Sequence, residues 1–439
     1  MAEKIQSNKL FYGWLIVAVG FFTLFLATGA RNAFGVFVVP MSEELEWTRS
    51  QVSAAGAIGI LINGLTQPFI GRLYDKYGGR SVISISLAVL GISTMLMSTI
   101  SNIWMLIVLF GFVSSTALSG ASLVTIHAMI ARWFYRRRGM ALSLCSAGPS
   151  AGALVLVPLA TYLIITANWR VAWFAMGAFI FFLALPLAYI IFRDDPKDIG
   201  EVPEGRKNAN ANNLKAGASG AYVEVQPPLA TENWKESFRS PPIWQLSGAY
   251  FICGMTTLII SFHYVPFALD RGISPGEAAA AFGLMGGLNV VGVIIIGFLA
   301  DRFSRKNLLG TVYAIRFCAY VLLVMMPGSL GIWGFAVLAG LSWVATPPLT
   351  SSLTADIYGL RNLGTLGGIS TLAHNVGGAI SVLAAGYLYD KLGAYEIPFA
   401  LAGSMLLIAS IASFSVKERR YSVRYQKAAT EPSTAGDGD

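Results

Sequence analysis

Long apolar stretches separated by short polar segments follow one another along almost the whole chain. Residues 81–131 contain no Asp, Glu, Lys or Arg over 51 positions, which is enough for two membrane-crossing helices of about 20 residues each. A backbone in hydrocarbon must satisfy its own hydrogen bonds, and the alternating pattern of barrel strands is absent, so the pattern predicts helices. Twelve such runs lie at residues 11–39, 51–71, 81–101, 103–131, 139–165, 169–192, 243–269, 277–300, 307–326, 330–355, 363–388 and 395–415.

The twelve runs fall into two sets of six, separated by a polar stretch rich in Asn, Gly, Pro and charge. We therefore predict an all-α membrane protein with two six-helix halves around a central cavity. The predicted parts are an N-terminal half at 1–192, a cytoplasmic linker at 193–240 and a C-terminal half at 241–416. A cytoplasmic tail follows at 417–439, and its composition predicts disorder.

The distribution of basic residues predicts the orientation. Charged residues make up 12% of the chain, against about 25% in soluble proteins. With both termini and the linker assigned to the cytoplasm, 25 of the 31 Lys and Arg residues lie on that side. The opposite loops hold four, and two lie inside spans. This bias predicts that both termini are cytoplasmic, and it explains the net charge of +8 without a nucleic-acid partner. We expect a multi-pass protein of a bacterial inner (cytoplasmic) membrane. We expect a monomer.

One ten-residue motif occurs twice, at the same place in each half. "GRLYDKYGGR" (71–80) follows the second run and "GFLADRFSRK" (297–306) follows the eighth. Such internal repeats are typical of secondary transporters. Ordinary basic loops explain the Arg and Lys, but not the matched Gly, Leu and Asp. We predict an ion-pair latch that gates the inner face, formed by the acids Asp75 and Asp301 with the basic residues of the two loops, which are Arg72, Lys76, Arg80, Arg302 and Arg305.

These motifs give the chain a resemblance to the major facilitator superfamily over nearly its whole length. A narrower resemblance is to the monocarboxylate transporters and their bacterial relatives, which include oxalate–formate antiporters. It rests on "FYGW" (11–14), "WFYRRRGMALSLCSAGPSAG" (133–152), "WRVAWFAMG" (169–177) and "DIYGLRNLGTLGG" (356–368), with departures at Met140, Ser143 and Pro149. The resemblance implies that the first, fourth, seventh and tenth spans line the cavity, and that the two halves rock around a central site.

The eighth span departs from the family in a way that bears on the substrate. Monocarboxylate transporters usually carry an Asp there and, four residues later, an Arg that binds the substrate carboxylate. The matching positions in this chain are Asn289 and Val293. Another cation must therefore serve if the substrate is an anion.

Two arginines lie inside apolar runs, where a cation is costly and usually faces a protein interior. Arg31, beside Asn32, is on the first span, so we predict that it faces the central cavity and binds the substrate's negative charge. The alternative is that it snorkels to the outer headgroups. Arg316 is on the peripheral ninth span, where packing or a lipid contact is the better interpretation.

His374 and Asn375 lie near the middle of the eleventh span, where the oxalate–formate antiporters place a lysine. A histidine titrates near neutral pH, so we assign His374 to substrate binding and proton coupling, with Asn375 and Asn289 as further substrate ligands. A neutral His374 bonded to a neighbouring span fits the sequence equally well. His127, near the inner end of the fourth span, is interpreted as structural.

No metal-ligand cluster, nucleophile elbow or phosphate-binding loop occurs in the sequence. We therefore predict neither enzymatic activity, nor a cofactor, nor ATP as the driving force. The predicted function is secondary transport of a small organic anion, specifically a monocarboxylate, by proton symport or anion exchange. The alternatives are a membrane sensor on a transporter scaffold and a transporter of a non-carboxylate solute.

Overall fold

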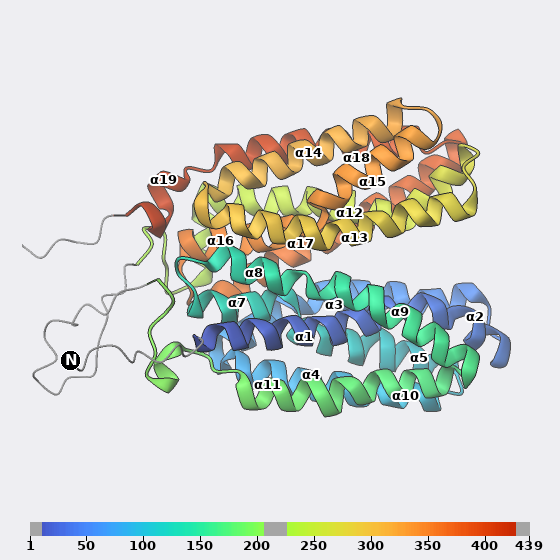
Figure 1. The fold of residues 1–439 in the computed structure, drawn as a ribbon, viewed down its shortest axis with the longest axis horizontal. Coiled ribbons are helices and arrows are strands. Elements are labelled where there is room, and N and C mark those ends of the chain that lie inside the picture. The colour runs from blue at the N-terminus through green and yellow to red at the C-terminus, as the bar shows by residue number, and fades with distance from the viewer. Residues whose placement is uncertain (1–10, 206–225, 427–439) are drawn as a thin grey trace, which may run out of the picture.

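The computed structural model describes residues 11–205 and 226–426, except for the side chains of residues 49, 50 and 53. This part of the chain is almost entirely helical and contains twelve helices long and apolar enough to cross a membrane. Helices α1 to α11 form one bundle and α12 to α18 form the other (Figure 1). The predicted all-α fold of two six-helix halves is confirmed.

In the N-terminal half, five of the six spans consist of more than one helical segment. The segments are α1 (Tyr12–Asn32) with α2 (Phe34–Glu44), α3 (Arg49–Tyr77), α4 (Gly79–Leu96) with η1 (Met97–Thr99), α5 (Ile103–Leu106) with η2 (Ile107–Ser114), α6 (Ser115–Gly120) and α7 (Leu123–Trp133), α8 (Arg138–Ser146) with α9 (Gly148–Thr166), and α10 (Trp169–Phe179) with η3 (Ile180–Ala184) and α11 (Leu185–Ile191).

In the C-terminal half, only the tenth span is interrupted. The segments are α12 (Pro241–Asp270), α13 (Pro275–Arg302), α14 (Arg305–Met325), α15 (Gly328–Ser342) with η6 (Trp343–Ala345) and α16 (Thr346–Tyr358), α17 (Leu363–Leu392) and α18 (Glu396–Ser415). Each half has an apolar core of its own.

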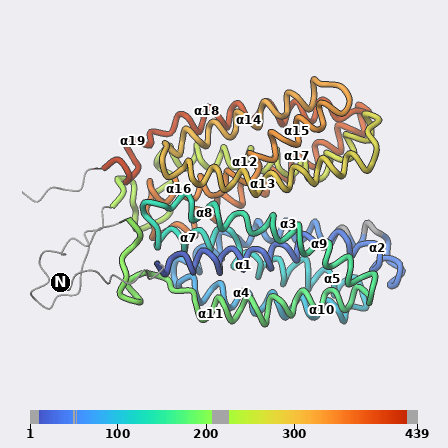
Figure 2. The backbone as a smooth tube through the Cα atoms, in the orientation of Figure 1, coloured from blue at the N-terminus to red at the C-terminus, as the bar shows by residue number. Residues whose placement is uncertain are grey.

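The chain passes from α11 to α12 at one end of the molecule, which we call the linker end because residues 193–205 and 226–240 lie there (Figure 2). The opposite end is called the open end. The two halves meet along a seam, where α3 packs on α17 and where α8 and α9 pack on α13.

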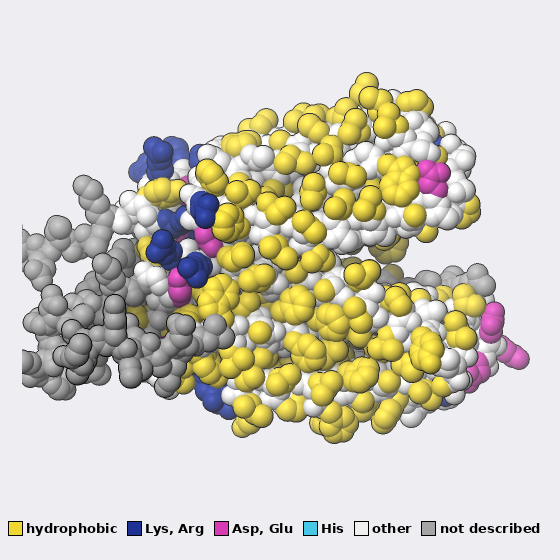
Figure 3. Space-filling view, viewed as in Figure 1, with side chains coloured by type: hydrophobic (Ala, Val, Ile, Leu, Met, Phe, Trp, Pro, Cys, Tyr) yellow, Lys and Arg dark blue, Asp and Glu magenta, His cyan; other side chains and the backbone are white. Residues whose placement is uncertain are grey.

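Glycines of the repeated motif allow the two halves to pack closely at the linker end. A Cβ on Gly71 would lie 2.2 Å from the carbonyl oxygen of Gly364, and a Cβ on Gly297 would lie 2.4 Å from Ser143 Cβ. Nearer the open end of α13, a Cβ on Gly283 or Gly287 would meet nothing within 4 Å. Figure 3 shows the molecule hollowed between the halves at that end. The halves are therefore in contact at the linker end and apart at the open end.

The tenth span is interrupted because its sequence removes backbone donors. Pro347 and Pro348 have no N–H, so the carbonyl groups of Trp343 and Val344 lose their helical partners, and η6 (Trp343–Ala345) replaces one turn of α-helix. The fourth span is interrupted between Gly120 and Leu123. The apolar pattern predicted neither interruption.

The described parts of the linker and tail contain short helices, although the composition predicts disorder for the tail. The linker contains η4 (Pro196–Ile199) and η5 (Trp234–Arg239), and the tail contains α19 (Glu418–Tyr421) and η7 (Val423–Tyr425). The tail is ordered because Glu418 and Arg424 cap helix ends of the C-terminal half. Residues 1–10, 206–225 and 427–439 of the predicted parts lie outside the described residues.

Candidate functional site

Asp75, at the linker end of α3, crosses the seam to the first turn of α17. Its carboxylate accepts hydrogen bonds from the backbone N–H groups of Gly364 (2.9 Å) and Thr365 (2.7 Å) and from the Thr365 hydroxyl (2.6 Å). The first N–H groups of a helix have no partner within it, and the helix dipole favours negative charge there. Asp75 thus caps a helix of the opposite half.

Asp301, at the equivalent place on α13, makes the equivalent contact in the other direction. Its carboxylate accepts from the N–H groups of Gly139 (2.7 Å) and Met140 (3.0 Å), at the start of α8. The structure therefore places the two predicted latch acids across the seam. Their partners across it are backbone N–H groups, where the sequence had predicted basic side chains.

Three of the basic residues assigned to the latch lie elsewhere. Arg72 and Arg302 are exposed, and the Arg302 guanidinium lies over the ring of Phe298. Arg80 donates to the carbonyl oxygen of Tyr189 (2.9 Å) in its own half. Among the described residues, none of these three arginines forms an ion pair across the seam in this conformation, so their part in the latch stays a prediction.

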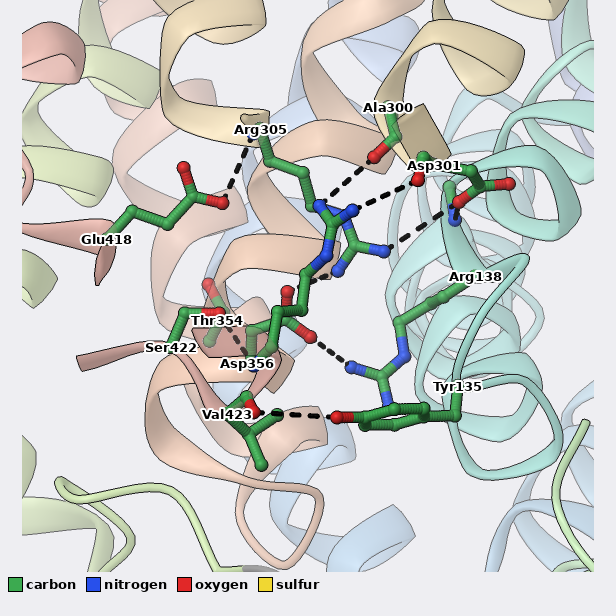
Figure 4. Close-up of polar contacts among 12 residues, drawn as sticks. Tyr135, Arg138, Ala300, Asp301, Arg305, Thr354, Asp356, Glu418, Ser422 and Val423 are labelled. Carbon is green, nitrogen blue, oxygen red and sulfur yellow. Dashed lines mark hydrogen bonds and ion pairs between the residues drawn. The ribbon is translucent and has the colours of Figure 1, made fainter. Parts of the chain in front are cut away.

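A buried charge cluster closes the seam beside Asp301. Asp356, at the end of α16, accepts from Arg138 of the opposite half (2.5 Å) and from Arg305 of its own half. Figure 4 shows the Asp356 carboxylate between the two guanidinium groups. The three side chains are at most 4% exposed. Sequence reasoning assigned Asp356 no role, although an acid at the end of an apolar run was a usable signal.

Farther from the linker end, neutral polar side chains connect the halves. His127 shares hydrogen bonds with Ser351 of the opposite half (3.0 Å) and with Ser146 (2.9 Å). A cavity of about 30 Å³ lies beside His127, between residues of α7, α12, α16 and α17. His127 was interpreted as structural, and it connects three spans at the seam.

Asn289, at the position where the family usually has an Asp on the eighth span, is also at the seam. Its amide donates to the Ser150 hydroxyl of the opposite half (2.9 Å), and its oxygen accepts from the N–H of Val344 (2.9 Å) next to the break in the tenth span. Asn289 therefore connects the seam to that break.

His374 and Asn375 lie on α17 with their side chains partly buried. The His374 ring packs on Tyr250 of α12 at a centroid distance of 4.8 Å, and its Nδ1 is 3.4 Å from the Asn375 oxygen. Asn375 packs on α3, since a Cβ on Gly64 would lie 2.9 Å from the Asn375 side chain. Three predicted substrate ligands, Asn289, His374 and Asn375, therefore belong to the helices that form the seam.

Arg31 lies within the N-terminal half. It lines a cavity of about 20 Å³ together with Thr94 of α4, Ser114 and Ser115 of the fourth span, and Trp173 of α10. Asn32 is exposed. The prediction that Arg31 faces the space between the halves is not met in this conformation, because its side chain turns towards the third, fourth and sixth spans.

Arg316 lines a cavity of about 10 Å³ inside the C-terminal half. Its guanidinium donates to the carbonyl groups of Ser342 (2.6 Å) and Trp343 (2.5 Å) and to the sulfur of Cys253 (3.3 Å). It thus satisfies the Trp343 carbonyl group that Pro347 leaves without a helical donor. Packing was the better interpretation from the sequence, and the contacts add a specific role at the break in the tenth span.

The two arginine cavities occupy equivalent places in the two halves. Gly71 and Gly297 of the repeated motif are 226 positions apart, and we apply this offset to the neighbouring spans, matching the first span with the seventh and the third with the ninth. The equivalents of Arg31 and Arg316 are Thr257 and Leu90, and each lines the other arginine's cavity. With 225 positions between the fourth and tenth spans, further equivalent pairs are Phe110 and Phe335, Ser114 and Ala339, and Leu118 and Trp343.

Comparison with known proteins agrees with this architecture. The model of the Major Facilitator Superfamily matches residues 20–382. The chain belongs to this superfamily. Among the described residues, no group of three or more His, Cys, Asp and Glu side chains lies together as a metal site would require.

Curated relatives of this superfamily member are distant but cover most of the chain. An uncharacterized MFS-type transporter, YcxA of Bacillus subtilis, is 26% identical over 88% of this chain and 91% of its own. Monocarboxylate transporter 12 of Rattus norvegicus is 24% identical over 91% and 84%. The probable sulfoacetate transporter SauU of Cupriavidus necator is 25% identical over 95% of each.

Solved structures of the superfamily share the fold. The fucose:proton symporter FucP of E. coli aligns with a TM-score of 0.66 at 14% identity, over 90% of this chain and 97% of its own. The proton:xylose symporter XylE aligns equally well, at 12% identity over 91% and 94%.

Proposed function

We propose that the protein is a secondary active transporter that moves a small organic anion, such as a monocarboxylate, by alternating access. The observation that carries the proposal is the asymmetry of the seam. Equivalent contacts of Asp75 and Asp301 hold the halves together at the linker end, while the halves stand apart at the open end. A transporter in which two repeats rock about a central site needs such contacts, which form in one state and break in the other.

The two intramembrane arginines support an anionic substrate. Among the described residues, neither Arg31 nor Arg316 has a carboxylate partner within 4.0 Å. Two uncompensated cations, one in each half, make the potential between the halves positive. Relatives named as monocarboxylate and sulfoacetate transporters also move anions.

We further propose that the linker end faces the cytoplasm of a bacterial inner membrane, and that the working unit is a monomer without enzymatic activity. Uptake of radiolabelled carboxylates into proteoliposomes tests the function. Uptake driven by an imposed pH gradient indicates symport, and uptake that requires anion inside the vesicles indicates exchange. Binding without uptake under either condition would favour the sensor alternative.

Arg31 lies in a cavity of its own half, so we expect it to act on the anion through its charge and without a direct contact. Arg31→Lys should then retain affinity, and Arg31→Gln should weaken binding about tenfold. At a separation of about 10 Å and an effective dielectric constant of about 20, one charge contributes about 1.7 kcal/mol. Calorimetry on folded wild type and the two variants measures the difference.

Leu90→Gln is a matched control, because it places a neutral amide in the same cavity while Arg31 remains. It should leave the affinity unchanged. If Arg31→Lys weakens binding as much as Arg31→Gln does, Arg31 contacts the anion directly with its two parallel donors. Equal affinities for all variants would show that Arg31 does not influence substrate binding.

His374 is the proposed proton-coupling residue, because it lies on α17, a helix of the seam, and is partly buried beside Tyr250. His374→Gln should make the transport rate less dependent on pH, because a glutamine side chain cannot take up and release a proton. The rate is measured in proteoliposomes at a series of external pH values. His263→Gln is the control, since His263 contacts Tyr395 near the open end. A profile that keeps its wild-type shape in His374→Gln would contradict the assignment.

A further inference from the structure

A basic pocket lies at the linker end of the C-terminal half, away from the seam. It has a volume of about 500 Å³ and lies where the start of α14 meets the segment after α18. Its lining includes Lys306, Asn307, Lys417, Arg419, Arg420 and Tyr425. Figure 3 shows Lys and Arg gathered at this end of the C-terminal half, next to apolar surface.

The pocket has four cations and no free carboxylate to compensate them. Glu418 is the acid in its lining, and its carboxylate is engaged by the Ser304 hydroxyl and by the N–H groups of Arg305 (3.2 Å) and Lys306 (3.3 Å). These contacts cap α14 and occupy the carboxylate oxygens of Glu418. The pocket therefore suits an anion that takes several hydrogen bonds, as a phosphate group does.

The surroundings of the pocket indicate that the phosphate belongs to a lipid headgroup and is not a free ion. The Lys306 ammonium group donates to the carbonyl oxygen of Phe414 at 2.7 Å, so the pocket adjoins the last turns of α18. On those turns, the side chains of Ile411 and Phe414 are 67% and 42% exposed. An apolar helix surface next to a basic pocket fits one molecule that has both acyl chains and a charged headgroup.

We propose that this pocket binds the headgroup of an anionic phospholipid. The phosphate lies among Lys417, Arg419 and Arg420, and the acyl chains follow α18. This inference requires only that the protein resides in a bilayer, and it does not depend on the transported substrate.

The segment that forms the pocket also holds the turn that carries Asp301. Arg424 donates to the carbonyl groups of Ala300 (3.2 Å), Asp301 (3.0 Å) and Phe303 (3.3 Å) at the end of α13. Glu418 caps the start of α14 on the other side of the same turn. A bound headgroup that orders residues 417–425 therefore favours the state in which Asp301 caps α8.

The test measures binding of phosphatidylglycerol and phosphatidylcholine to the full chain by native mass spectrometry. Wild type should bind phosphatidylglycerol more tightly. The triple variant Lys417→Gln/Arg419→Gln/Arg420→Gln should lose about 100-fold in affinity for it, since each cation near a membrane surface contributes about fivefold. The control triple variant Lys76→Gln/Lys235→Gln/Arg239→Gln removes the same charge elsewhere at the linker end and should bind as wild type does.

An equal loss in both triple variants would overturn the proposal, because the effect would then belong to net charge. A second outcome would also overturn the proposal and make free phosphate the ligand. In that outcome, wild type does not bind phosphatidylglycerol more tightly than phosphatidylcholine, and millimolar inorganic phosphate displaces phosphatidylglycerol. If the triple variant fails to fold, Lys417→Gln alone should lower the affinity for phosphatidylglycerol about fivefold. An unchanged affinity in that variant would contradict the proposed site.

Discussion

Replacing Asp356 by Asn is expected to destabilise the protein by about 3–5 kcal/mol, which is typical when one partner of a buried ion pair is removed. The loss is large because Asp356 serves two arginines at once. Arg138 is 4% exposed and Arg305 is fully buried, so both cations would remain out of water without their carboxylate. The free energy of unfolding is measured by titration with sodium dodecyl sulfate in mixed micelles.

Two further variants test the cause of this loss. Arg138→Gln/Asp356→Asn removes a charge of each sign and leaves Arg305 with Asp301, 3.8 Å away, so it should be more stable than Asp356→Asn alone. Glu232→Gln breaks the exposed pair between Glu232 and Arg361, where solvent screens the charges, and should change little. If Asp356→Asn is as stable as wild type, the cluster does not carry the proposed charges.

Asp75→Asn is expected to shift the conformational equilibrium towards the state that is open at the linker end by about 10- to 150-fold. A hydrogen bond to a charged group contributes about 1.5–3 kcal/mol, and every 1.4 kcal/mol corresponds to a factor of ten. The variant should transport more slowly and still bind substrate, because Asp75 lies at the linker end and outside the proposed site. Cross-linking of a cysteine pair across the seam measures the population of the closed state.

Asp301→Asn should give a shift of similar direction, since Asp301 makes the equivalent contact with α8. Asp194→Asn is a matched control, because Asp194 accepts from the N–H of Arg80 within the N-terminal half and does not cross the seam. It should leave the closed population unchanged. Loss of substrate binding in Asp75→Asn, with an unchanged equilibrium, would sink the proposal that Asp75 is a latch.

The twelve spans were predictable because hydrophobic length alone decides whether a helix crosses a membrane. The roles of Asp75 and Asp301 were partly predictable, because an acid repeated at equivalent places needs a reason beyond loop charge. Their partners were not predictable. A backbone N–H group at a helix start is present in every sequence, so residue types carry no signal of it.

The direction of Arg31 was not predictable from the sequence. The first span is apolar nearly all round, so its pattern does not show which face meets the cavity between the halves. Asp356 was missed for another reason. Its partners Arg138 and Arg305 are 218 and 51 positions away in the chain. Packing of α14 on α16 brings Arg305 to it, and packing of the two halves brings Arg138.

The equivalent cavities around Arg31 and Arg316 say something about descent. If the two halves arose by duplication of one six-helix unit, the sequence position of the arginine has changed, but the cavity that it lines has not. The N-terminal half supplies the cation from its first span, and the C-terminal half supplies it from its third span, at the opposite side of the equivalent cavity. Each cavity has therefore retained a positive charge, although the sequence position that provides the arginine differs between the two halves.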